Sequence, residues 1–129
     1  MLVRSREGGG WLFGGFTAAG FSPPADGGDA WIGDPDAFLF SLANRDPPLG
    51  CSERFASLRT GNDLFYTARA AASFGDDYGL HVCGDADRVA GSYVQTGLAY
   101  AESALVGANP MTQSRQASWH AAEVVAWVV

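Results

Sequence analysis

Short apolar segments, separated by clusters of Gly, Pro, Asp and Asn, follow one another along the chain. No long segment with the 3.6-residue period of an amphipathic helix interrupts them, and this pattern is typical of a multistranded β domain. We predict a mainly β fold with six strands near Leu2 to Arg4, Trp11 to Thr17, Ala37 to Leu42, Asp63 to Thr67, Gly79 to Cys83 and Ala121 to Val128.

The segment from Gly20 to Asp36 predicts a long surface loop, because it holds three of the six prolines, four aspartates and four glycines. Within it, Trp31 and Ile32 are the residues that we expect to pack inward. The run Phe38 to Phe40 predicts a core strand, and we expect Trp119 and Trp127 to lie in the core as well.

Composition and charge limit the classes of function. With 129 residues and 47% apolar content, the chain is long enough to form one packed domain, residues 1–129. Its formal charge of −6 opposes binding to the phosphates of nucleic acid. No apolar run approaches the roughly 20 residues that cross a bilayer, and no signal peptide is evident, so we expect a cytoplasmic protein without a transmembrane segment.

The most chemically suggestive stretch, Ser73 to Asp87, contains one of the two histidines, one of the two cysteines and four aspartates. Strand alternation places His81 and Cys83 on one face, opposite Leu80 and Val82. Two ligands are too few for a zinc site, and an extended backbone separates this His from this Cys. We therefore predict no metal site and no catalytic residues there. The aspartates are interpreted as acidic turns.

Several segments resemble, in order and spacing, those of TLDc domains. These segments are L-F-G-G-F-T (Leu12 to Thr17), G-D-P-D-A-F-L-F-S-L-A-N (Gly33 to Asn44), L-F-Y (Leu64 to Tyr66), S-F-G-D-D-Y-G-L-H-V (Ser73 to Val82), S-Y-V-Q-T-G-L-A-Y (Ser92 to Tyr100) and A-E-V-V-A-W (Ala122 to Trp127). The resemblance covers nearly the whole chain, which lacks the N-terminal portion of the family domain. Gly79 replaces an acidic residue of the family pattern, and Val125 replaces the second acid of the last strand.

The resemblance implies an antiparallel two-sheet β-sandwich with short peripheral helices. It implies no cofactor and no established catalytic residues, and it associates the chain with oxidation resistance and with binding of the vacuolar-type proton-pumping ATPase. We expect recognition at the loop Asp76, Asp77 and Tyr78. The family-motif residues expected to be structural are Gly14, Gly15, Phe38, Phe40, Ser73, Phe74, Gly75 and Glu123.

The leading hypothesis is a noncatalytic protein-interaction domain, cytoplasmic and brought to organelle membranes by its partner. Its acidic surface would suit a basic patch on that partner. One alternative is a β-sandwich that binds a carbohydrate or another small ligand through exposed aromatic residues such as Trp11, Trp31 and Tyr78. A second alternative is a thiol-dependent antioxidant that uses Cys51 or Cys83.

Overall fold

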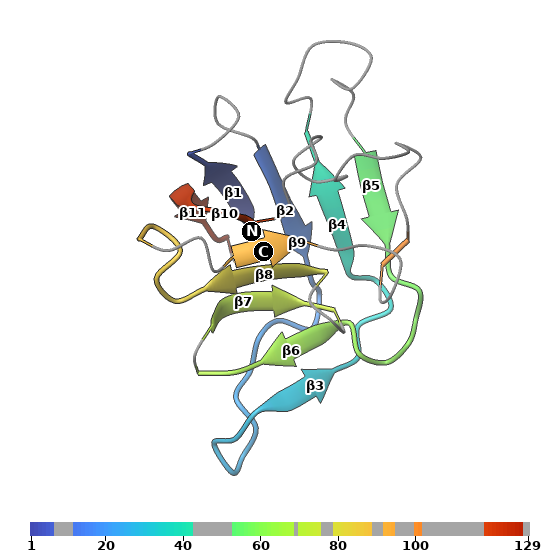
Figure 1. Cartoon of the computed structure of the whole chain (residues 1–129). Coiled ribbons are helices and arrows are strands. Elements are labelled where there is room, and N and C mark those ends of the chain that lie inside the picture. Colours follow the sequence, from blue (N-terminus) through green and yellow to red (C-terminus); the bar gives the residue numbers. More distant parts are fainter. Residues whose placement is uncertain are drawn as a thin grey trace.

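The computed structural model describes residues 1–6, 12–42, 53–68, 70–75, 79–88, 92–94, 100–101 and 118–127. These residues form two antiparallel sheets, with strand orders β11-β1-β2-β4-β5 and β10-β9-β8-β7-β6-β3 (Figure 1). The strands are β1 (Leu2–Ser5), β2 (Leu12–Phe16), β3 (Ala30–Ile32), β4 (Phe38–Ser41), β5 (Glu53–Ala56), β6 (Leu64–Tyr66), β7 (Ala70–Phe74), β8 (Leu80–Cys83), β9 (Ser92–Val94), β10 (Ser118–Trp119) and β11 (Ala121–Val125).

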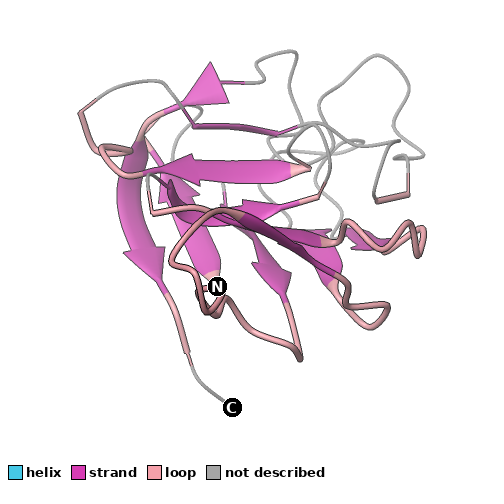
Figure 2. Cartoon of the chain, turned by 90° about the horizontal axis from the view of Figure 1, so that it is seen from below, coloured by secondary structure: helices cyan, strands magenta, loops and turns pink. Residues whose placement is uncertain are grey.

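The two sheets pack as layers, and the strands of one run across those of the other in Figure 1. This arrangement confirms the mainly β, two-sheet class. The short peripheral helices are not seen, since every regular element among the described residues is a strand (Figure 2).

Each of the six predicted strand segments overlaps an observed strand, but five strands were missed: β3, β5, β7, β9 and β10. The error at β3 is the clearest, because this strand lies inside the segment predicted to be a loop. Its three residues pair with β6 in the register Ala30↔Tyr66, Trp31↔Phe65 and Ile32↔Leu64. Three residues are too few for a detectable alternation, and the partner strand supplies the stabilising contacts.

The hydrophobic core lies between the sheets and follows the alternation of the strands. From the five-stranded sheet come Phe13, Leu39 and Phe55, and from the six-stranded sheet come Leu80 and Trp119, all at most 1% exposed. The rings of Phe13 and Trp119 meet edge to face with centroids 4.9 Å apart. This contact joins β2 to β10 across the sandwich.

Two predictions of inward packing are wrong, those for Trp127 and Trp31, whereas Ile32 packs against the core as predicted. Trp119 is buried, but Trp127, two residues beyond β11, is 62% exposed. Trp31 is 44% exposed and packs on Phe65, with ring centroids 4.5 Å apart. In β4 only Leu39 of the F-L-F run points into the core. Its half-buried neighbours Phe38 and Phe40 share the outer face, because adjacent residues in a strand point to opposite sides.

The glycine pair of β2 lets the chain approach its neighbours closely. A methyl carbon at Gly14 would overlap the carbonyl oxygen of Met1, and one at Gly15 would lie 2.6 Å from Cζ of Phe74. Phe74 belongs to the other sheet, so the missing side chain at Gly15 sets how closely β2 and β7 can approach.

Gly75 ends β7 with a positive φ of 88°, a conformation that costs a residue with a side chain more than it costs glycine. Its N–H donates to the carbonyl oxygen of Asp63 at 2.8 Å. The S-F-G motif therefore combines a core aromatic residue with the turn that follows it.

We predict that Gly15→Ala lowers the free energy of unfolding by about 1–3 kcal/mol, because the added methyl group overpacks the ring of Phe74. Urea-induced unfolding measures the effect. The matched control is Gly33→Ala, where the added carbon would lie 3.4 Å from the nearest atom, the carbonyl oxygen of Gly61. Equal stability of Gly15→Ala and the unsubstituted protein would contradict the role assigned to this glycine.

Candidate functional site

Strand β8 carries the His and Cys that made the sequence look catalytic. Leu80 and Val82 are buried in the core, whereas His81 and Cys83 are half-buried, so burial alternates along the strand as predicted, although Cys83 still packs against the core. Burial lowers the pKa of the His81 imidazole, which favours its neutral form. Cys83 is a free thiol, and its sulfur accepts a hydrogen bond from the Ser92 hydroxyl at 3.3 Å. The hydroxyl is not a base, so this contact does not activate the thiol.

The acidic turn after β8 is exposed, as the sequence interpretation has it. Asp85 and Asp87 face solvent, and the backbone N–H of Arg88 donates to the carbonyl oxygen of Asp85 at 2.9 Å. The Arg88 guanidinium lies 3.8 Å from the Asp87 carboxylate, and a pair this exposed contributes little to stability. Among the residues that the structure describes, no three His, Cys, Asp or Glu side chains come together in a way that could hold a metal ion.

The predicted recognition loop, Asp76, Asp77 and Tyr78, lies outside the described residues. The structure does place both of its neighbours. Gly75 is held by Asp63 on one side, and Gly79 is buried before Leu80 on the other. The ends of this loop are therefore fixed by the β7–β8 pair.

Glu123, expected as a family-motif residue, lies on β11 opposite Arg4 of β1. Its Oε2 is 3.6 Å from Nε of Arg4, and about half of each side chain is exposed. This cross-strand ion pair is screened by solvent, so it contributes to strand register more than to stability.

Asp34 is a buried carboxylate that organises the end of β2, and the sequence analysis did not single it out. Its Oδ2 accepts hydrogen bonds from the Thr17 hydroxyl at 2.6 Å and from the N–H groups of Ala18 and Ala19 at 2.7 and 3.0 Å. Desolvation opposes ionisation of this carboxyl, but the hydrogen bonds from Thr17 and the backbone outweigh it and hold its pKa below the ordinary value. The Asp34 carboxylate therefore stabilises the fold.

Asp63 connects the same region to the first sheet. Its carboxylate accepts hydrogen bonds from the N–H of Asp34 at 2.8 Å and from the hydroxyl of Ser57, which follows β5. Its carbonyl oxygen accepts a 2.6 Å hydrogen bond from the Tyr100 hydroxyl. Burial, with the charges of Asp63 and Asp34, raises the pKa of that phenol, so Tyr100 acts as a hydrogen-bond donor throughout the ordinary pH range.

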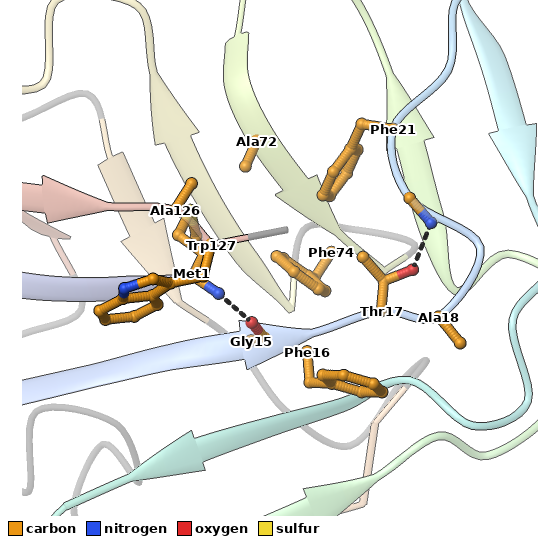
Figure 3. Close-up of a pocket in the computed structure, with 11 residues that line it drawn as sticks. Met1, Gly15, Phe16, Thr17, Ala18, Phe21, Ala72, Phe74, Ala126 and Trp127 are labelled. Atoms are coloured by element: carbon orange, nitrogen blue, oxygen red, sulfur yellow. Dashed lines mark hydrogen bonds between the residues drawn. The ribbon is translucent and has the colours of Figure 1, made fainter. Parts of the chain in front are cut away.

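An apolar pocket of about 490 Å³ lies where β2 and β7 end, and sequence reasoning missed it. Figure 3 shows Trp127 and Ala126 on one side of it and Phe21 on the other, with Phe74 between them. Its walls come from four separate parts of the chain, so no local motif identifies it. Trp127 gave no signal either, because the sequence places it inside a strand predicted to run to Val128.

Comparison of the chain with protein-family models, with curated proteins and with solved structures gives no match. No helix among the described residues is long and apolar enough to cross a membrane. The candidate sites therefore rest on the residues and their geometry.

We predict that Asp34→Asn lowers the free energy of unfolding at neutral pH by about 1.5–3 kcal/mol, the range for hydrogen bonds to a charged group. Because the pKa of Asp34 in the folded state lies below its ordinary value of 3.8, ionisation stabilises the fold above that pH. This stabilisation is lost as the pH falls below 3.8 through the folded-state value.

Urea unfolding of both proteins between neutral pH and pH 3 tests the prediction, and the stability difference should shrink only at the acidic end. Asp36→Asn is the matched control, since it removes an exposed carboxylate from the same turn. Its effect should stay within about 0.5 kcal/mol. A stability difference between Asp34→Asn and the unsubstituted protein that does not vary with pH would contradict the assignment.

Proposed function

We propose that the chain is a noncatalytic protein-interaction domain of the TLDc type. Its proposed role is protection from oxidative damage, binding of the vacuolar-type proton-pumping ATPase, or both. The observation that carries the proposal is that the family-like segments coincide with strands of the sandwich. L-F-G-G-F is β2, F-L-F-S is β4, L-F-Y is β6, A-S-F ends β7, L-H-V lies in β8 and A-E-V-V lies in β11.

The pairing of these strands adds support, because segments far apart in sequence must fit one another. Gly14 and Gly15 of β2 pair with Phe40 and Leu39 of β4, so the glycine pair lies beside the F-L-F run. Phe74 of β7 pairs with Leu80 of β8, the first residue of the L-H-V segment. The quoted motifs thus make contact as two pairs of neighbouring strands, one in each sheet.

The distribution of acidic groups favours recognition over catalysis. The two most buried carboxylates described, Asp34 and Asp63, are occupied by hydrogen bonds within the domain. Exposed carboxylates lie on turns, as at Asp26 and Asp87, and on strands, as at Glu123. With a formal charge of −6, such a surface attracts a basic patch on a protein partner and repels nucleic acid. The domain would act in the cytoplasm, at organelle membranes where the pump resides.

The test is recovery of proton-pump subunits from a lysate by the immobilised chain. We expect pump subunits at about 0.05 M NaCl and a several-fold lower yield at about 0.5 M, because salt screens attraction between exposed charges. Recovery of no pump subunit at the lower salt concentration would count against the proposed partner.

A pair of double variants tests the recognition loop within the same assay. Asp76→Asn with Asp77→Asn should reduce recovery several-fold. Asp85→Asn with Asp87→Asn removes the same charge from the turn after β8 and should reduce it much less. Equal losses would indicate that overall charge, and not this loop, determines binding.

A further inference from the structure

We propose that the pocket at the ends of β2 and β7 is a binding site for one uncharged, mainly apolar molecule with an aromatic ring. This function goes beyond protein recognition and needs no protein partner. The pocket volume of about 490 Å³ lies within the roughly 300–1,000 Å³ of small-molecule sites. The aromatic side chains that face it are Phe21, Phe74 and Trp127.

Contacts already present in the structure hold most of this aromatic wall. Phe74 is 1% exposed, and Phe21 packs edge to face against it with ring centroids 5.2 Å apart. These two rings are therefore positioned before any ligand arrives, which reduces the entropy lost on binding. Trp127 is 62% exposed, so a ligand could cover a ring that water now contacts.

The polar groups on the wall favour an uncharged ligand, because they are already engaged. The Thr17 hydroxyl donates to Asp34 at 2.6 Å and accepts from the N–H of Gly20 at 3.0 Å. The N–H of Ala18 donates to Asp34 at 2.7 Å. A sugar entering this pocket would exchange its hydrogen bonds to water for contacts with groups that have other partners, and would bind poorly.

Met1 carries the one ionisable group among the described residues that line the pocket. Its amino group donates to the carbonyl oxygen of Gly15 at 2.8 Å, and the N–H of Gly15 donates to the carbonyl oxygen of Met1 at 3.1 Å. Burial lowers the pKa of this amino group. Because the amino group already donates to Gly15, it joins the other polar groups of the wall that have partners within the domain.

Two probes that share a ring system test the class of ligand. N-phenyl-1-naphthylamine is uncharged, and 8-anilinonaphthalene-1-sulfonate adds one sulfonate. Titration of the full chain, followed by probe fluorescence and calorimetry, should give one site for the uncharged probe and affinity at least about tenfold weaker for the sulfonate. Absence of saturable binding, or a sulfonate that binds as tightly, would overturn the proposal.

Two tryptophan variants locate the site. Trp127→Ala should weaken binding of the uncharged probe about tenfold, because it removes one aromatic wall. Trp31→Ala is the matched control, since it removes the exposed ring on β3, which does not line the pocket. Equal affinity of Trp127→Ala and the unsubstituted protein would place the probe elsewhere and overturn the assignment.

A third variant blocks the pocket from an exposed position. Ala126→Phe adds a ring at a lining residue that faces solvent, so the fold should tolerate it, and binding should fall at least about tenfold. Circular dichroism checks that each variant is folded. Displacement of the probe by maltose would favour a carbohydrate site and contradict the ligand class proposed. The pull-down with pump subunits is independent of all these results.

Discussion

The hydrogen bonds of Asp63 are the constraint on which much of this sandwich depends. This residue precedes β6 and is 1% exposed, yet both its carboxylate and its carbonyl oxygen are engaged. Its carboxylate accepts hydrogen bonds from Asp34 after β3 and from Ser57 after β5. Its carbonyl oxygen accepts hydrogen bonds from the N–H of Gly75 and from the Tyr100 hydroxyl. One buried polar residue thus links both sheets at the points where strands end. Buried polar groups of this kind are stabilising only when every partner is present.

The same network explains why the acidic character of the sequence is a poor guide to chemistry. Asp34 and Asp63 are buried and hydrogen-bonded, so they position backbone groups and are not available as general acids or metal ligands. Asp85 and Asp87, which lie within the stretch that looked most catalytic, are exposed on a turn. On β8, His81 and Cys83 are only half-buried, and Cys83 packs against the core. The described residues of this stretch therefore form no group of three side chains that could hold a metal ion.

Strands could be predicted from the sequence where apolar and polar residues alternate clearly. The prediction failed for strands that are defined only by pairing with a distant partner. Leu80 and Val82 were correctly predicted to face the core, since period-2 alternation is local information. Strand β3 has three residues inside a segment rich in Gly, Pro and Asp, and its partner β6 lies far along the chain, with Ile32 paired to Leu64. Trp127 was predicted to be buried on hydrophobicity alone. Its exposure depends on where the sheet ends, which no local pattern encodes.

The pocket depends on two features that also stabilise the fold, the close approach of the sheets at Gly15 and the hydrogen bonds of Asp34. At Gly15 the missing side chain brings Phe74 against β2, so the sandwich is closed at that point. Two residues after Gly15, the Thr17 hydroxyl donates a hydrogen bond to the Asp34 carboxylate, and so does the N–H of Ala18. These bonds tie the segment that follows β2 to the segment that follows β3. Phe21 then returns to pack against Phe74 and completes a wall that β2 does not supply. A loss of the Asp34 carboxylate would therefore alter the pocket as well as the stability of the domain, because one hydrogen-bonded turn determines both.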